Sequence, residues 1–203
     1  MDLTQQTYNK IAEDWYHDHH DDDWWVAGTD HLISLLPAGA SVLDVGCGCG
    51  WKARYLRERG FVVTGIDYSE GLLKIAEKEN PGPEFLLMDM HEVAKLNRQF
   101  DCIFAQASLL HIPRAEIGSM IKSLCEILKP GGLFYAAVKG IKENQAEEGI
   151  KTENDYGYEY QRFFSYHRPE EMRKHFADAK LEVVWENVKR NGNTDWIQII
   201  GKK

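Results

Sequence analysis

The alternation of short apolar segments with helical segments is the feature that most restricts the fold of this chain. β-rich segments occur at residues 41–45, 61–66, 84–87, 100–105 and 133–138. Segments with helical spacing or helix-capping residues lie between them, for example at 51–59, 69–76 and 117–128. Strands that alternate with helices pair in parallel and carry helices on both faces of the sheet. The sequence therefore predicts an α/β protein.

The C-terminal part departs from this alternation. A helix is predicted to begin at Pro169, and two β-rich segments follow it at 181–188 and 194–200. Asn191-Gly192 stands between these two segments, and Asn-Gly is strongly preferred in tight β-hairpin turns. We therefore predict a mostly parallel, seven-stranded sheet that ends in an antiparallel hairpin.

Length and charge limit the domain organisation and the partners. The chain has 203 residues, of which 43% are hydrophobic, so one domain spanning 1–203 is expected. Its 32 acidic and 24 basic residues leave a net charge of −8. An acidic chain is a poor partner for nucleic acid or for an anionic membrane surface, so neither is expected. No apolar run is long enough to span a membrane, and the start of the chain does not resemble a signal peptide.

The cysteines and the histidine-rich run bear on location and metal binding. Cys47, Cys49, Cys102 and Cys125 all lie in segments expected to be buried, which is typical of reduced cysteine in the cytoplasm. Cys47-x-Cys49 has no second pair at zinc spacing. The run 17–23 holds histidines and aspartates, but its spacing matches no defined site. No metal is therefore predicted. A contact from His19 or His20 to a substrate is the more plausible role for this run.

The turn after the first strand is rich in glycine. Gly46, Gly48 and Gly50 occupy alternate positions after the apolar segment 41–45. Glycine allows a tight turn and a close approach of the backbone to a ligand. Open α/β sheets bind ligands at the carboxyl ends of their strands. These glycines are therefore predicted to line a cofactor site.

Two aspartates follow the next strands. Asp67 follows the strand 61–66, where an acid accepts hydrogen bonds from a ribose diol. Asp89 follows the strand 84–87, where a carboxylate can accept from an exocyclic amine such as that of adenine. The predicted ligand thus contains a ribose and an adenine ring. On the residues alone, both a dinucleotide and S-adenosylmethionine fit this description.

Longer segments resemble the class I S-adenosylmethionine-dependent methyltransferases over nearly the whole chain. They are VLDVGCGCG (42–50), VTGIDYSEGLLKIAEK (63–78), FDCIFAQASLLHIP (100–113), LCEILKPGGLFYAAVK (124–139) and the cap-like YNKIAEDWY (8–16). The resemblance implies a Rossmann-like three-layer sandwich. It also implies N-terminal cap helices within 1–36 and an inserted segment on the substrate side at 140–166. The expected terminal hairpin agrees, because the usual dinucleotide-binding fold lacks one.

The resemblance also implies roles for individual residues. The glycine turn would pass under the methionine part and the sugar, and Asp67 would hold both ribose hydroxyls. Tyr68 and Met90 would contact the adenine, and the Gln106 carbonyl would lie near the cofactor's amino group. The full set of cofactor-binding residues implied is Tyr8, Tyr16, Asp44, Gly46, Cys47, Gly48, Gly50, Asp67, Tyr68, Asp89, Met90 and Gln106.

The predicted activity is transfer of the sulfonium methyl group to a nucleophile on a small molecule, with S-adenosylhomocysteine as product. His111 is the candidate base, because histidine ordinarily titrates near neutral pH. The alternative is that His111 packs under its loop or caps the next helix. Aromatic residues within 15–25 and 156–166 could form a lid over a flat acceptor. Arg162 and Arg168 are either carboxylate-binding or surface residues.

Two further functions are compatible with the sequence to different degrees. A non-catalytic protein that binds S-adenosylmethionine is the main alternative. A dinucleotide-dependent oxidoreductase is disfavoured by Asp89 and by the terminal hairpin. Residues 105–108 read Ala-Gln-Ala-Ser and not the acidic–Pro–Pro–aromatic tetrapeptide of nucleic-acid amino methyltransferases. The acceptor, the atom that is methylated and the oligomeric state are not encoded in a recognisable pattern.

Overall fold

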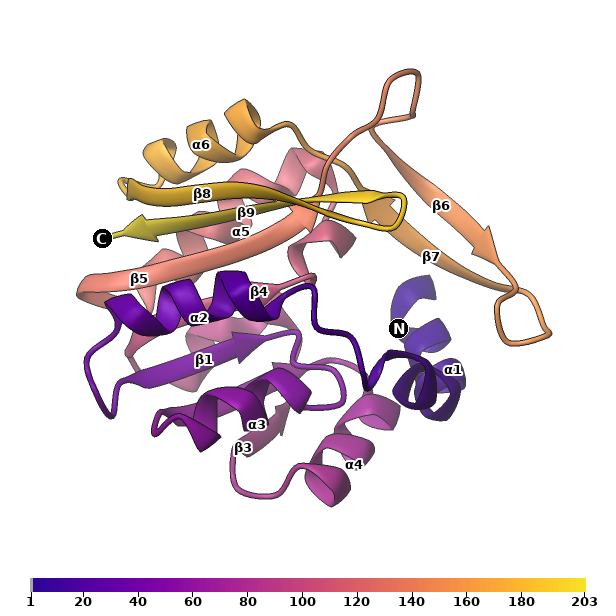
Figure 1. The fold of residues 1–203 in the computed structure, drawn as a ribbon, viewed down its shortest axis with the longest axis horizontal. Coiled ribbons are helices and arrows are strands. Elements are labelled where there is room, and N and C mark those ends of the chain that lie inside the picture. The colour runs from indigo at the N-terminus through magenta and orange to yellow at the C-terminus, as the bar shows by residue number, and fades with distance from the viewer. Residues whose placement is uncertain (1) are drawn as a thin grey trace.

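A seven-stranded sheet runs through the middle of the molecule in the computed structural model, which describes residues 2–203 (Figure 1). The first five strands across the sheet are parallel, and β9 is antiparallel to both of its neighbours. The predicted fold class is thereby confirmed. In spatial order the strands are β3 (Glu84–Leu87), β2 (Val62–Asp67), β1 (Ser41–Val45), β4 (Phe100–Gln106), β5 (Leu128–Lys139), β9 (Thr194–Lys202) and β8 (Glu182–Asn191).

The terminal hairpin forms where Asn-Gly predicted it. Asn191 pairs with Thr194, which leaves Gly192 and Asn193 as the turn. Gly192 has φ 53°, a left-handed conformation that glycine adopts without steric penalty. Several strand boundaries differ from the expectation by one to three residues, and the start of β5 differs by more. β5 begins at Leu128 and not at Leu133, because Leu128 pairs with the start of β4 before an irregularity shifts the register.

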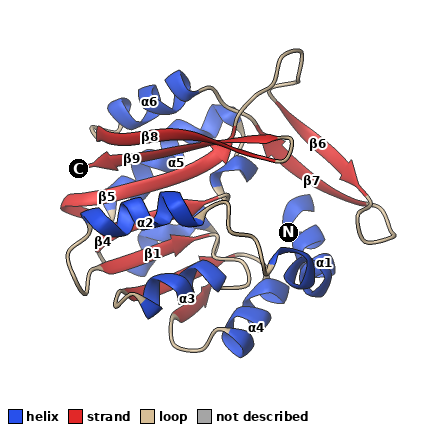
Figure 2. Ribbon diagram, in the orientation of Figure 1, coloured by secondary structure: helices blue, strands red, loops and turns tan. Residues whose placement is uncertain are grey.

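Helices cover both faces of the sheet (Figure 2). On one face, α2 (Val26–Leu35) and α3 (Trp51–Glu58) pack against alternate sheet residues such as Val42 and Phe104. On the other face, α5 (Arg114–Glu126) and α6 (Pro169–Asp178) pack against residues such as Leu43 and Ile103. Successive strand residues point to opposite faces, so each strand contributes to both apolar cores. The two short 3₁₀ helices are η1 (Met90–Leu96) and η2 (Leu109–His111).

Two segments far apart in sequence lie side by side over the carboxyl ends of the strands (Figure 1). Helix α1 (Leu3–His19) packs against α4 (Glu70–Glu79) and against β7 (Tyr160–Ser165). Strand β7 pairs only with β6 (Glu148–Glu153), in a two-stranded sheet separate from the main one. The sequence predicted an insertion here but not its strands. β6 is almost wholly exposed and so has no apolar alternation to reveal it.

Among residues 2–203, no helix combines the length and the apolar character that crossing a membrane requires.

Candidate functional site

The glycine turn between β1 and α3 shapes one side of a cavity at the carboxyl edge of the sheet. Gly46 has φ 71°, and a Cβ there would lie 2.4 Å from the Cβ of Ser108. Gly48 has φ 55°, and a Cβ there would meet no atom within 4 Å. Gly50 has φ 81° and would clash with the ring of Phe85 at 2.7 Å. Gly46 and Gly50 are therefore needed for packing, whereas Gly48 borders open space.

Asp67 ends β2 directly beside this turn. Its Oδ2 accepts from the backbone N–H of Gly48 at 2.9 Å, and its Oδ1 accepts from the N–H of Ser69 at 2.8 Å. Burial raises the pKa of Asp67 to about 6, although these backbone donors work in the opposite direction. The carboxylate thus holds the turn in place and also lines the cavity.

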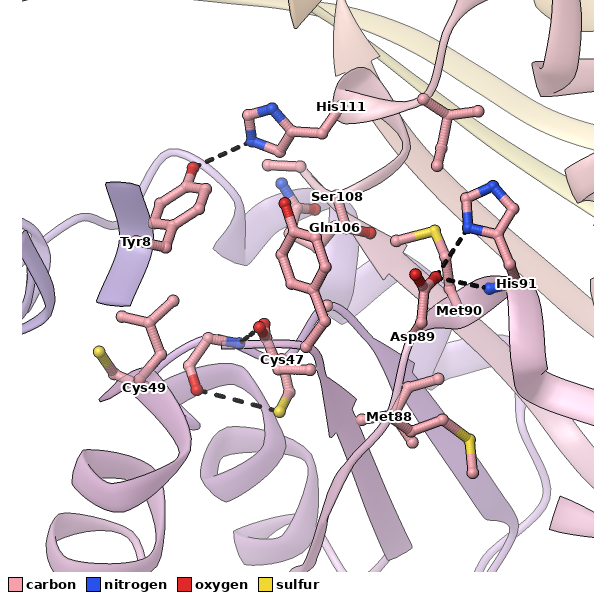
Figure 3. Close-up of a pocket in the computed structure, with 18 of the residues that line it drawn as sticks. Tyr8, Cys47, Cys49, Met88, Asp89, Met90, His91, Gln106, Ser108 and His111 are labelled. Carbon is pink, nitrogen blue, oxygen red and sulfur yellow. Dashed lines mark hydrogen bonds and ion pairs between the residues drawn. The ribbon is translucent and has the colours of Figure 1, made fainter. Parts of the chain in front are cut away.

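The cavity has a volume of about 320 Å³, within the range of small-molecule sites. Figure 3 shows residues from α1, from the end of β4 and from the segments that follow β1, β3 and β4 converging on it. Most of the residues expected to bind a cofactor line it, namely Tyr8, Gly46, Cys47, Gly48, Asp67, Tyr68, Asp89, Met90 and Gln106. His111 lines it as well.

Three residues of the expected set do not line this cavity. Gly50 packs against the ring of Phe85, as described above. Asp44 is buried in β1, where burial raises its pKa to about 7 and Lys52 partly opposes the shift. Tyr16 stacks on Trp51 with ring centroids 5.5 Å apart, so Trp51 lines the cavity and Tyr16 supports it from behind.

Buried polar side-chain atoms at this edge of the sheet fit a polar ligand. Asp44 Oδ2, Gln106 Nε2 and Ser108 Oγ have no hydrogen-bond partner among the described residues. A buried polar atom without a partner costs about 1–3 kcal/mol, so a ligand or an ordered water that satisfies it is favoured. The amide oxygen of Gln106 already has a partner, because Oε1 accepts a hydrogen bond from the Tyr135 hydroxyl at 2.8 Å.

Asp89 follows β3 and also lines this cavity. Its Oδ1 accepts from the backbone N–H of His91 at 2.9 Å and lies 2.7 Å from Nδ1 of the same histidine (Figure 3). Burial lowers the pKa of His91, but the Asp89 and Glu116 carboxylates outweigh it and raise the value overall. One Asp89 oxygen is thus committed to His91, and the other is left to accept from a ligand amine.

His111, in the loop after β4, is held on both ring nitrogens. Its Nδ1 donates to the carbonyl of Phe163 at 2.7 Å, so its Nε2 is the unprotonated nitrogen and accepts from the Tyr8 hydroxyl at 3.0 Å. Arg162 Nη1 donates to the same hydroxyl at 3.0 Å. Burial lowers the pKa of His111 to about 3, with Arg162 and Lys139 adding to the shift. The premise that His111 titrates near neutral pH is therefore wrong.

The two arginines considered as carboxylate binders differ in environment. Arg162 is buried and paired with Glu153 at 2.7 Å, and so it is not a surface residue. Arg168 is partly exposed and takes part in the N-terminal cap of α6, with ion pairs to Glu147 and Glu171. Neither guanidinium is free to clamp a carboxylate.

The histidine-rich run ends α1. His19 pairs with Asp22 at 3.0 Å, on the border of a second cavity. Within the part of the chain that the structure describes, no three His, Cys, Asp or Glu side chains gather as a metal site would need.

The second cavity lies against the first and also has a volume of about 320 Å³. Six residues line both cavities: Tyr8, Trp15, Trp51, Lys52, Ala107 and His111. Sequence reasoning missed Trp51, Lys52 and Ser108 as site residues. The sequence did contain a signal for Trp51 and Lys52, because they follow the glycine turn directly. They are the first residues of α3, which begins at the same edge of the sheet as the cavity.

The fold and this edge of the sheet together define an α/β protein of the Rossmann-like type with a nucleotide-cofactor site. A family model described as a methyltransferase domain matches residues 42–132, from the start of β1 into β5. This part of the chain is a methyltransferase domain, and the chain has the Rossmann-like methyltransferase fold.

Curated relatives match part of their own length. The ubiquinone biosynthesis O-methyltransferase of Coxiella burnetii (strain RSA 331 / Henzerling II) is 31% identical over 156 residues, which are 68% of this chain and 66% of that protein. The malonyl-[acyl-carrier protein] O-methyltransferase of Buchnera aphidicola is 33% identical over 93 residues, or 46% of this chain and 37% of that one. The chain thus spans slightly less than two thirds of the first relative.

Solved structures share the fold over almost the whole chain. Magnesium protoporphyrin IX methyltransferase from Synechocystis superposes with a TM-score of 0.75, covering 98% of this chain and 94% of that one at 17% identity. The 1,6-didemethyltoxoflavin-N1-methyltransferase of Burkholderia thailandensis gives a TM-score of 0.76, covering 98% and 86% at 17% identity. At this identity the likeness concerns the fold.

Proposed function

We propose that this protein transfers a methyl group from S-adenosylmethionine to a small-molecule acceptor. The observation that carries the proposal is the pair of adjoining cavities, of which one holds the glycine turn and the strand-end aspartates and the other is largely aromatic. The curated relatives named above are methyltransferases, and this favours catalysis over a purely cofactor-binding role.

The first cavity is proposed to hold the cofactor. Asp67 accepts from the ribose hydroxyls, Tyr68 and Met90 contact the adenine, and Asp89 accepts from its amine. Backbone at Gly46–Gly48 runs beneath the sugar and the methionine part. When bound, S-adenosylmethionine supplies a sulfonium methyl group that is already activated for nucleophilic attack. The protein then has mainly to orient the acceptor and to exclude water.

The second cavity is proposed to hold the acceptor. The residues that line both cavities mark where the reacting group lies. Tyr8, His111 and Lys52 are the ones among them that can exchange protons, and Tyr8 and His111 are bonded to each other. His111 Nε2 remains the proposed proton acceptor, reached through the Tyr8 hydroxyl that it already binds. Its low pKa makes it a weak base, so this role suits an acceptor whose proton is already acidic.

The similar proteins also indicate the chemical class of the acceptor. The similar proteins named above concern ubiquinone biosynthesis, a toxoflavin precursor and magnesium protoporphyrin, and this favours a small molecule over nucleic acid. The net charge of −8 supports the same choice. We further propose that the protein works in the cytoplasm, on the basis of its four free, buried cysteines.

Calorimetry with S-adenosylmethionine and with NAD tests the cofactor assignment. Binding of the former and not the latter is expected, and the reverse would refute the proposal. Formation of S-adenosylhomocysteine across a panel of small acceptors then tests catalysis. Cofactor binding without turnover on any acceptor would favour the non-catalytic alternative.

A further inference from the structure

The second cavity is walled by flat rings. Trp24 stacks on Trp196 with ring centroids 3.9 Å apart and planes inclined by 17°. Tyr156 stacks on Tyr160 at 5.4 Å, and Phe164 lies on the same lining. Such walls bind a flat, apolar ligand by offset stacking and by burial of its faces.

Several of the charged groups that border this cavity are already paired with or hydrogen-bonded to neighbours. Arg162 is paired with Glu153, which Lys151 also contacts at 2.9 Å. At the rim, Asp155 accepts from the Tyr160 hydroxyl at 2.9 Å, and Asp22 pairs with His19. These contacts hold the walls in place and already engage these groups.

Lys139 is a cation on this lining that has no such partner in the described part of the chain. It ends β5, and its ammonium lies 4.0 Å from the ring centroid of Phe164 and 5.9 Å from that of Trp196. Across residues 2–203, no carboxylate oxygen lies within 4.0 Å of this ammonium, and no hydrogen bond from it is formed. Burial lowers the pKa of Lys139 to about 8, with Arg162 adding to the shift. The side chain thus remains largely protonated at neutral pH.

A cation surrounded by rings and without a counter-ion is best satisfied by an anionic ligand, because desolvation strengthens the pairing. Lys52 also has no ion pair with any described residue, but it is less suited to this role because it borders both cavities and so lies beside the proposed cofactor site as well. Lys139 borders only the second cavity, so an anion there would be held apart from the cofactor.

We propose that the second cavity selects a flat aromatic acceptor that carries a carboxylate, and that the carboxylate pairs with Lys139 while the ring lies between the aromatic walls. This inference rests on the proposed function and deepens it. It assigns the recognition of the acceptor's charge to Lys139, a residue that no sequence motif singled out, and not to either of the arginines first considered.

Calorimetry with two matched probes tests the assignment. The probes are 2-naphthoate and 2-naphthalenemethanol, which share a ring system and differ in charge. Each is titrated into the protein already saturated with S-adenosylhomocysteine, so that the first cavity is occupied. We expect naphthoate to bind about tenfold more tightly than the alcohol, as a charged hydrogen bond predicts.

Variants of this lysine and of a neighbour complete the test. Lys139→Met should abolish the preference for naphthoate, and Lys139→Arg should retain it. Lys142→Met, at an exposed position three residues along the chain, is the control and should behave as the wild type. If Lys139→Met does not fold, the wild-type preference and the Lys139→Arg result decide the question.

The possible failures are distinguishable. Equal binding of the two probes by the wild type, or an unchanged preference in Lys139→Met, would overturn the role of Lys139 and leave the proposed function intact. Absence of S-adenosylhomocysteine binding by the folded protein would instead refute the proposed function.

Discussion

The hydroxyl of Tyr8 lies 3.0 Å from Nε2 of His111, and the two rings meet edge to face with centroids 5.4 Å apart. These residues are 103 positions apart, one in α1 and the other in the loop after β4. Their contact places a protonatable pair where the two cavities meet.

Replacing His111 by alanine should lower turnover about 100-fold if its Nε2 accepts the proton from the acceptor. The affinity for S-adenosylhomocysteine should stay unchanged, because the proposed cofactor contacts come from other residues. Steady-state kinetics and calorimetry measure the two effects. Tyr8→Phe should also slow turnover. Tyr158→Phe is the control, because it removes an exposed hydroxyl that is bonded to Asp14 of α1, the helix that also carries Tyr8. An unaltered rate in His111→Ala would exclude it as the base.

Gly48→Ala should fold and yet fail to bind the cofactor. The new methyl group would meet no protein atom within 4 Å and would project into the first cavity. The strain of alanine at φ 55° costs about 1 kcal/mol. Gly39→Ala is a matched control, since Gly39 has φ 73°, equal space around it and a position outside the cavity. We expect similar losses of thermal stability, with at least roughly tenfold weaker S-adenosylhomocysteine binding only in Gly48→Ala. Equal affinities would place the cofactor elsewhere.

Asp67→Asn should weaken cofactor binding by about 10–100-fold, as loss of charged hydrogen bonds to the ribose predicts. The pKa of Asp67 is about 6, so wild-type affinity should fall as the pH drops through that value and the carboxylate is protonated. The variant has no carboxyl group there and should show a flatter profile. Titrations between about pH 5 and pH 8 compare the two. Parallel profiles would show that another group controls the pH dependence.

Asp44 provides a prediction about stability. Burial raises its pKa in the folded protein to about 7, above the ordinary value of 3.8. Between these two values the folded state holds more protons than the unfolded state, so stability falls as the pH rises. From about pH 5 to about pH 8, the wild type should lose about 1–3 kcal/mol more unfolding free energy than Asp44→Asn. Urea denaturation measures this difference, and equal losses would contradict the buried, ionisable state of Asp44.

Local patterns were sufficient for the main sheet. Alternation of apolar strands and helices predicted the parallel strands, and Asn191-Gly192 predicted the terminal hairpin, because both depend on residues close in sequence. The strand-end position of Asp67 and Asp89 predicted that they meet in one cavity, since parallel strands end at one edge.

The remaining features depend on contacts that no local pattern encodes. Strand β6 is exposed and polar, so its pairing with β7 left no periodicity to read. Tyr16 shares the helix of Tyr8 but faces Trp51 and not the cavity. Nothing in the sequence around Lys139 sets it apart from other lysines. Its environment becomes distinctive only in the folded protein, where the rings of Phe164 and Trp196 lie beside its ammonium.

The sequence by itself thus determined the sheet, the glycine turn and the acids that border the first cavity. Tertiary structure alone decided what closes over that edge, because α1 and β7 come together from distant parts of the chain. Their packing brings Arg162 to the Tyr8 hydroxyl, encloses His111 between Tyr8 and Phe163, and removes water from the imidazole. Desolvation is a property of the assembled environment, and so the low pKa of His111 could not be deduced from the residue or its neighbours in sequence.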